Sequence, residues 1–254
     1  MSLHNLPNLF RAKVINRPSK TIKSPYVADI LLDDGTETLC HTPGLGCSGL
    51  VSTGRYIYVS KASGTKAKTS FTAQISENDD SEGTFYIGIH PMVSQLIASK
   101  LLNRISSTAV WKSEVKINEH TRLDYVGTTQ ESKKIYVEVK NAMISNKEPR
   151  TSRRAIFPEG YRKSIKDTIS PRAVKHAETL TELVNRPDTE EAYLLFIVPR
   201  SDCISGLELN KLDPIYCNAV SRALENGVKV LVFGLDFQKD GTVNFNSKLD
   251  FHIP

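Results

Sequence analysis

The chain has 254 residues, a net charge of +5, 39% apolar residues and 24% charged residues. This composition is typical of a globular protein and excludes disordered, collagen-like and disulfide-scaffold chains. The longest apolar run, 192–198, is too short to span a membrane, and the N-terminal residues lack the apolar stretch of a signal peptide. We therefore expect a soluble, intracellular protein, cytoplasmic or nuclear, with one large domain or two small ones.

The first third of the chain is predicted to form short strands bounded by proline, glycine and aspartate turn signals. These strands span 9–16, 26–32, 36–42, 55–60 and 69–76. Five strands without a helix are typical of a small β-barrel, most often of the oligonucleotide/oligosaccharide-binding type. The polar, acidic segment 77–83 is expected to separate this barrel, residues 1–84, from a second domain, residues 85–254.

In the second domain, helices are predicted to alternate with strands. Apolar spacing predicts helices that begin near Pro91, Ala173 and Pro214, two of them with proline in the first turn. Strands are predicted at 109–117, 123–128, 134–140, 192–198 and 228–233. The fold class is therefore mixed α+β: a five-stranded barrel, then an α/β domain whose helices cover the faces of a mixed central sheet.

Acidic residues and one lysine form the main candidate for a catalytic site. Side chains alternate along a strand, so Glu138 and Lys140 share one face of the strand predicted at 134–140. Antiparallel pairing with the preceding strand would bring Asp124 beside Glu138, and Glu114 lies on the strand before that.

Neighbouring carboxylates repel each other unless a cation lies between them, and hard oxygen ligands suit Mg²⁺. Such a site supports phosphodiester hydrolysis, because the cation stabilises developing charge and activates a water molecule beside Lys140. An exposed cross-strand ion pair would explain the same residues without catalysis.

The basic surplus of the chain is concentrated in residues 147–176. This segment holds nine basic and three acidic residues, a net charge of +6, so the rest of the chain sums to −1. A local surplus of this kind indicates contact with a polyanion. A solvated loop is the alternative.

Two further motifs are expected to be structural. Gly44–Gly49 matches the dinucleotide pattern GxGxxG, but the strand at 55–60 leaves no room for the helix that would hold a pyrophosphate. We therefore expect a tight loop between strands. The four cysteines, at 40, 47, 203 and 217, are expected to be free thiols. A zinc site from Cys40, His41 and Cys47 is disfavoured because adjacent strand residues point to opposite faces.

Several short blocks, taken in order, resemble the sugar fermentation stimulation protein A family. They are Tyr26–Gly35, His41–Gly46, Glu114–Lys116, Arg122–Tyr125, Tyr136–Lys140, Phe157–Pro158, Lys175–His176, Leu195–Val198, Asp213–Pro214 and Gly227–Val228. The order of the blocks is more specific than any one of them. This chain departs from the family pattern at Gly44–Gly46, in extra residues between 158 and 172, and at Ala173, where glycine is usual.

The resemblance implies an N-terminal oligonucleotide-binding barrel and a C-terminal domain of the PD-(D/E)xK nuclease superfamily. It also implies DNA binding and a suggested regulatory role in sugar metabolism. Asp124, Glu138 and Lys140 fall on the nuclease motif, and Glu114 falls on its upstream acid.

The leading hypothesis is a nuclease that acts on DNA, with RNA as an alternative substrate, and that uses Mg²⁺, with Mn²⁺ as an alternative metal. Asp124 and Glu138 would ligate the metal with help from Glu114, and Lys140 would orient the attacking water. The residues expected to contact phosphates are Lys61, Lys66, Lys68, Arg122, Arg153, Arg154, Arg172, Lys175 and His176. The other hypothesis is a non-catalytic DNA-binding regulator that uses the nuclease scaffold only as a platform. No membrane partner is expected, and the oligomeric state is left open.

Overall fold

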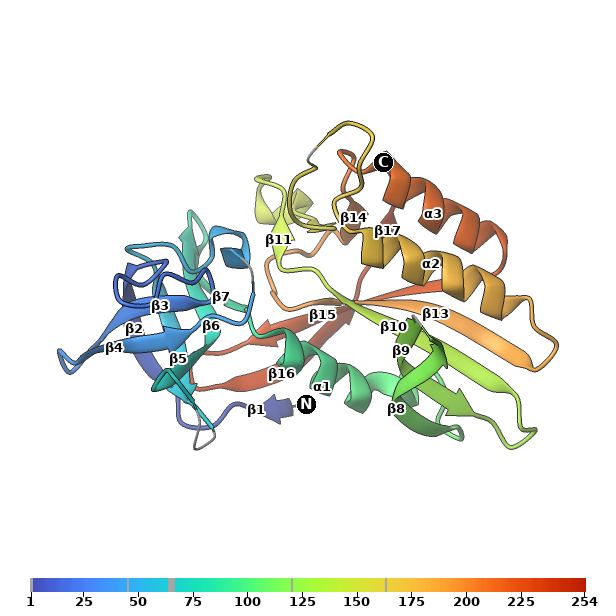
Figure 1. Ribbon diagram of the computed structural model, residues 1–254, viewed down its shortest axis with the longest axis horizontal. Coiled ribbons are helices and arrows are strands. Elements are labelled where there is room, and N and C mark those ends of the chain that lie inside the picture. The colour runs from blue at the N-terminus through green and yellow to red at the C-terminus, as the bar shows by residue number, and fades with distance from the viewer. Residues whose placement is uncertain (1, 45, 64–66, 120, 163) are drawn as a thin grey trace. The chain divides into compact units, whose positions relative to one another are not determined.

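The computed structural model describes residues 2–44, 46–63, 67–119, 121–162 and 164–254, and its chain divides into two compact units (Figure 1). Unit 1 comprises residues 1–97, 199–202 and 234–247, and unit 2 comprises 98–198, 203–233 and 248–254. The units are not contiguous in the chain, so they differ from the segments 1–84 and 85–254 predicted from the sequence.

Unit 1 is built on a six-stranded sheet with the strand order β4-β3-β2-β5-β6-β7. The five predicted strands are confirmed as β2 to β6. The bounds of the six strands are β2 Phe10–Asn16, β3 Val27–Leu32, β4 Glu37–His41, β5 Tyr56–Lys61, β6 Phe71–Asp80 and β7 Gly83–Gly88. β4 also pairs in parallel with β6, through Cys40 opposite Phe71 and His41 opposite Thr72. Another pair in unit 1 joins β1 (Ser2–Asn5) to β16 (Thr242–Lys248).

The predicted boundary segment 77–83 lies within a β-hairpin, because residues 77–80 belong to β6 and β7 begins at Gly83. The polar side chains of this segment are paired within the sheet. Arg11 donates to both carboxylate oxygens of Glu77, at 2.6 and 3.1 Å, and Tyr58 donates to Glu77 at 3.0 Å. Arg55 donates to the side-chain oxygen of Asn78 at 3.1 Å. Polar residues that look solvated in the sequence therefore form a hairpin.

The glycine-rich loop is confirmed as a short connection between β4 and β5. It contains a 3₁₀ helix at Gly46–Gly49, and β5 begins at Tyr56. The four cysteines are buried free thiols, as predicted. Burial, followed by the proximity of Cys47, raises the pKa of Cys40 far above its ordinary value. A thiol in this state is a packing residue.

Unit 2 is built around the strand order β13-β10-β9-β8, with the first residues of β15 beside β13. β10 pairs in parallel with β13 and antiparallel with β9, so the predicted mixed sheet is confirmed. The strand bounds are β8 Val110–Asn118, β9 Thr121–Thr128, β10 Lys134–Asn141, β13 Thr189–Val198 and β15 Lys229–Phe237. A small four-stranded sheet in unit 2 has the order β11-β12-β14-β17, with bounds Ile144–Ser145, Ala155–Phe157, Leu207–Leu209 and Phe251–His252.

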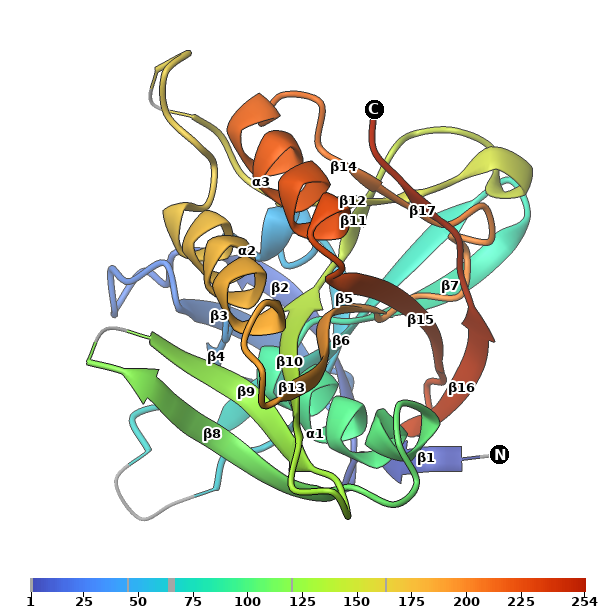
Figure 2. The ribbon, with the colours of Figure 1, turned by 90° about the vertical axis from the view of Figure 1, so that its right-hand side faces the viewer.

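Three α-helices are present in the described residues: α1 Pro91–Leu101, α2 Pro171–Val184 and α3 Pro214–Glu225. α2 and α3 lie side by side, as both views show (Figure 2). Their apolar residues, including Ala177, Leu180 and Val220, pack with Leu194 and Phe196 of β13 in one core. No described helix has both the length and the apolar character needed to cross a membrane.

Side-chain caps fix where α2 and α3 begin. The side chain of Ser170 accepts a hydrogen bond from the amide of Ala173, and that of Asp213 accepts one from the amide of Tyr216. Each cap satisfies an amide that has no partner within its helix. Asp213 also accepts hydrogen bonds from the side chain of Thr168, at 2.7 Å, and the amide of Ile169, at 2.8 Å. The start of α3 therefore holds the loop that leads into α2.

The first prediction concerns Glu77. The hydrogen bonds from Arg11 outweigh the effect of burial and, with the bond from Tyr58, lower the pKa of Glu77. A lowered folded-state pKa stabilises the fold above the ordinary pKa of glutamate, and this stabilisation is lost as the pH falls through the folded-state pKa. We expect Glu77→Gln to lower the free energy of unfolding by about 1–2 kcal/mol at pH 7.

Chemical denaturation at a series of pH values measures this effect. The difference between wild type and Glu77→Gln should shrink as the pH is lowered towards about 3. Glu82→Gln is the control, because Glu82 is exposed. A difference between wild type and Glu77→Gln that does not change with pH would contradict the assigned role of the Arg11 pair.

The second prediction concerns Gly88, at the end of β7. A Cβ atom there would lie 2.3 Å from the ring of Phe237, which is buried. We expect Gly88→Ala to lower the free energy of unfolding by about 1–3 kcal/mol. In the Phe237→Leu background, Gly88→Ala should lower the free energy of unfolding by less than it does in the wild type, because the smaller leucine side chain leaves room for the added methyl group. Equal losses in both backgrounds, measured by denaturation, would exclude the steric cause.

Candidate functional site

Glu138, Lys140 and His176 form a buried polar contact between β10 and α2. The ammonium group of Lys140 lies 2.5 Å from the Oε1 atom of Glu138. The Nδ1 atom of His176 contacts the same oxygen and lies 3.0 Å from the Lys140 nitrogen. Glu138 is only 3% exposed and His176 only 4% exposed. The alternation predicted for β10 therefore places Glu138 and Lys140 together, and α2 supplies the third member.

Asp124 lies on β9, the strand next to the one that carries Glu138. The backbone pairing of β9 with β10 ends with Tyr125 opposite Val137, one residue before Asp124 and Glu138. The Oδ2 atom of Asp124 accepts a hydrogen bond of 2.7 Å from the amide of Val139. Burial, followed by the charge of Glu138, raises the pKa of Asp124 to about 6. The two carboxylates therefore act on each other electrostatically.

Glu138 differs from Asp124 because cationic and polar partners compensate its charge. Burial raises the pKa of Glu138, but the hydrogen bond with His176 and the charge of Lys140 outweigh burial and lower the net value. Both partners contact Oε1, whereas the buried Oε2 atom has no hydrogen-bond partner among the residues that the structure describes. A buried carboxylate oxygen without a partner is costly unless a cation or water satisfies it.

Glu114 is exposed on β8 and lies across from Asp124. Its neighbours Ser113 and Val115 pair with Tyr125 and Leu123, so Glu114 falls opposite Asp124 in the register. Its charge contributes to the raised pKa of Asp124, after burial and Glu138. The φ angle of Glu114 is +53°, in the left-handed region that costs a non-glycine residue about 1–2 kcal/mol. Strain of this kind in the middle of a strand is typical of functional sites.

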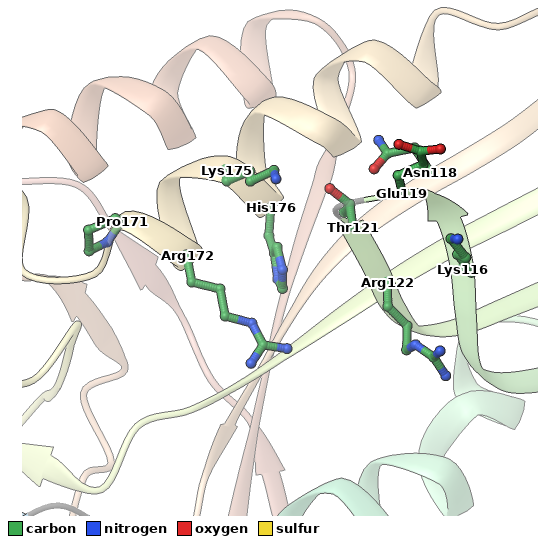
Figure 3. A pocket seen from close by; sticks show the side chains of 9 residues that line it. All are labelled: Lys116, Asn118, Glu119, Thr121, Arg122, Pro171, Arg172, Lys175 and His176. Carbon is green, nitrogen blue, oxygen red and sulfur yellow. The ribbon is translucent and has the colours of Figure 1, made fainter.

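A basic cavity of about 660 Å³ opens between α2 and the ends of β8 and β9 (Figure 3). The side chains of Arg172 and His176 leave α2 towards the strands that carry Lys116 and Arg122. Its lining residues are Lys116, Asn118, Glu119, Thr121, Arg122, Pro171, Arg172, Lys175 and His176. His176 belongs to both the cavity and the acidic cluster, so the two are adjacent.

The structure separates the basic residues predicted from the sequence into three groups. Four of them line the cavity: Arg122, Arg172, Lys175 and His176. Arg153 and Arg154 are not among the lining residues, and Arg154 forms an ion pair of 3.0 Å with Glu208. Lys61 and Lys68 are exposed residues of unit 1, and Lys66 lies outside the described residues.

Sequence reasoning missed Lys116 and gave His176 a different place. Lys116 pairs with Arg122 across β8 and β9, and the signal for this position was the alternation of Lys112, Glu114 and Lys116 along β8. His176 was predicted as a phosphate contact, but its ring is buried against Glu138. No sequence signal connects these two residues, because 38 positions separate them.

Metal-binding capacity rests on few residues. Within the part of the chain that the structure describes, no group of three or more His, Cys, Asp or Glu residues is arranged to hold a metal ion. The candidate donors are the two carboxylates of Asp124 and Glu138, with Glu114 on the exposed side. Two carboxylates match the small number of protein ligands with which Mg²⁺ is usually bound, since it keeps several waters.

Comparisons with known proteins agree on one family. The family model "Sugar fermentation stimulation protein RE domain" matches residues 89–241. A sugar fermentation stimulation protein homolog from Caulobacter vibrioides is 31% identical over 217 residues, covering 83% of each chain. A homolog from Acaryochloris marina is 28% identical over 248 residues, covering 94% of this chain and 92% of the relative.

A solved structure has the same fold along the whole chain. It is described as the structure of Pyrococcus furiosus SfsA in complex with Ca²⁺, and it matches with a TM-score of 0.77. The match covers 99% of both chains at 21% sequence identity, so it establishes the fold. Together with the family model, these similarities show that the chain belongs to the sugar fermentation stimulation protein family.

Proposed function

We propose that this protein is a Mg²⁺-dependent nuclease that acts on DNA. The observation that carries the proposal is the pair of carboxylates on β9 and β10, Asp124 and Glu138, which interact electrostatically beside a basic cavity. Buried acids next to a cavity lined by cations are unsuited to binding phosphate directly, because the acids repel it. They become useful when a divalent cation neutralises them.

The residues present fit a divalent cation. The partnerless Oε2 atom of Glu138 and the raised pKa of Asp124 are both features that a cation between the carboxylates would relieve. The Pyrococcus furiosus protein was solved as a Ca²⁺ complex, which supports an oxygen-ligand site in this fold. Bound Mg²⁺ would supply charge stabilisation at the phosphate and a water of lowered pKa. Mn²⁺ prefers similar oxygen ligands and is the alternative.

Lys140 would stabilise negative charge on the phosphate and orient the attacking water. Its ammonium group is held by Glu138 and His176, so its position is fixed before substrate binds. Fixed charges stabilise a transition state more effectively than mobile ones, because no reorganisation is needed during the reaction. His176 contacts both of these residues and is therefore a positioning residue.

The cavity residues would bind the nucleic-acid backbone. Lys116, Arg122, Arg172 and Lys175 place four cations around one concave space, against the single acid Glu119. Contacts of this kind give affinity and orientation without reading sequence. The N-terminal end of α2 adds a partial positive charge close to Arg172. Arg153 does not line this cavity, and we propose it only as a separate phosphate contact of unit 2.

Unit 1 would provide a second nucleic-acid contact. The pairing of β4 with β6 joins strands β2 to β6 in the order β4-β3-β2-β5-β6-β4, which supports a barrel of the oligonucleotide-binding type. Lys61 and Lys68 are exposed at one end of β5 and in the loop that follows it. We propose that they contact phosphates.

A non-catalytic DNA-binding regulator is the second candidate function. One observation favours it: Lys140 and His176 already compensate the charge of Glu138, so the cluster is stable without a metal. In this case the basic cavity would bind DNA, and the acids would only hold β10 against α2. The two candidates differ in whether the protein cleaves DNA: the nuclease does so with a metal ion and Asp124, whereas the regulator binds DNA and does not cleave it.

The third prediction tests catalysis with two variants. Asp124→Asn keeps an oxygen that can accept from the amide of Val139 but removes the charge, and Lys140→Gln keeps a donor for Glu138. We expect each to reduce the rate of Mg²⁺-dependent DNA cleavage by about 100-fold or more, because charge stabilisation in the transition state is lost. Binding to labelled DNA in EDTA should change little. Cleavage is followed on labelled single- and double-stranded DNA and RNA.

The matched controls are Glu131→Gln and Lys133→Gln, which remove the same charges from exposed positions between β9 and β10. Both should cleave like the wild type. Cleavage by the wild type that persists in EDTA would contradict the metal requirement. DNA binding by the wild type without cleavage in Mg²⁺ or Mn²⁺ would favour the regulator.

A further inference from the structure

A second basic cavity lies along the same strands, and no predicted function accounts for it. It has a volume of about 320 Å³. Four cationic residues line it, and none of its lining residues is acidic. The lining residues are Lys112, Val115, Lys116, Ile117, Val126, Thr128, Lys134, Tyr136 and Arg186.

The strand register places this cavity on the face of the sheet that carries the carboxylate pair. Lys112 pairs with Val126, and Val126 pairs with Tyr136. Two residues further along β10, on the same face, is Glu138. Lys116 lines both cavities, so one lysine connects the space beside Arg172 and Arg122 with the space beside Lys112.

The charges of this second cavity are mostly uncompensated by protein groups. Lys134 donates to the hydroxyl of Thr128 at 3.0 Å, and Tyr136 is buried beneath the cavity. Burial, followed by the charge of Asp188, raises the pKa of Tyr136, and the charge of Arg186 acts in the opposite direction. Among the described residues, the ammonium groups of Lys112 and Lys116 have no acidic partner.

Cations that converge on one concave space repel each other and concentrate anions there. Tyr136, the aromatic residue of the lining, is 6% exposed, so the cavity offers little ring surface on which a base could stack. Its chemistry therefore suits a phosphate group and not a nucleobase. Continuity with the first cavity favours a phosphate that belongs to the same strand.

We propose that the cavity of Lys112, Lys116, Lys134 and Arg186 binds a backbone phosphate of the nucleic acid whose scissile phosphate lies at Asp124 and Glu138. This inference rests on the proposed function and extends it by giving the strand a path over β8, β9 and β10. The strand would run from the space beside Arg172, past Lys116, to the space beside Arg186.

The test is the salt dependence of DNA binding by the full chain. The slope of log affinity against log salt concentration is negative, and each phosphate contact that is lost reduces its magnitude by about one. We expect Lys112→Gln/Lys134→Gln to reduce the magnitude of this slope by about one to two and to weaken binding about tenfold at low salt. The probe is a fluorescein-labelled 30-nucleotide DNA, single- or double-stranded, in EDTA.

The matched control is Lys211→Gln/Lys248→Gln, which removes the same charge from exposed residues of unit 2 that line neither cavity. Its slope should equal that of the wild type. An equal slope for the Lys112/Lys134 variant would overturn the proposal. Circular dichroism and denaturation confirm that both double variants are folded.

Inorganic pyrophosphate, followed through the fluorescence of Trp111, distinguishes a nucleic-acid phosphate from a free anion. Trp111 is the only tryptophan and lies next to Lys112. If the double variant loses pyrophosphate binding but keeps the wild-type DNA slope, the cavity is a free-anion site and the assignment to nucleic acid is overturned. A reduced DNA slope in a protein that cleaves nothing would refute the nuclease while supporting this phosphate site.

Discussion

The buried contact of Glu138 with Lys140 and His176 is the constraint on which the rest of unit 2 depends. A carboxylate that is 3% exposed costs several kcal/mol unless charged and hydrogen-bonded partners compensate it. Lys140 comes from the same strand, so the second partner has to come from another element, and α2 provides it. The contact therefore holds α2 in register with β10. The same helix then presents Arg172 and Lys175 to the cavity, which means that the position of the basic surface follows from the burial of one acid.

Acidic and basic groups in unit 2 are separated into a centre and a rim. Asp124 and Glu138 are at the centre, where burial and mutual repulsion act together on the pKa of Asp124. Lysine and arginine side chains surround them on β8, β9 and α2. A polyanion is attracted by the basic residues of the rim and repelled by the two acids at the centre. Binding of a polyanion therefore does not by itself explain why the acids lie there. The proposed divalent cation at the centre would reconcile them, and this is why the proposals for metal binding and for nucleic-acid binding depend on each other.

Local patterns in the sequence predicted most elements of the fold but not the pairings between distant segments. Side-chain alternation was enough for β10 and a continuous apolar run for β13, whereas apolar spacing was enough for α2 and proline in the first turn marked the start of α3. β7 was missed because its partners in β6, Glu77 and Asn78, are polar residues typical of a solvated loop. In the structure they are hydrogen-bonded to Arg11 and Arg55, and the sequence gives no sign of these contacts. The short strands β12 and β14 carry too few residues for a period to show. At the site, the spacing of Glu138 and Lys140 was visible, whereas the contact with His176 joins positions 38 residues apart.

The discontinuity of unit 1 has a consequence for the order of events during synthesis. β1 pairs with β16, and the amide of Gly88 donates to the carbonyl of Pro199. Residues 2–5 must therefore wait until their partners at 242–244 have been synthesised, about 240 residues later. At typical elongation rates of about 5–20 residues per second, that delay is on the order of ten seconds or more. The six-stranded sheet is complete once residue 88 has been synthesised, whereas β1 lacks its partner strand until β16 follows, so a fragment ending at residue 97 would keep the sheet and leave β1 without β16.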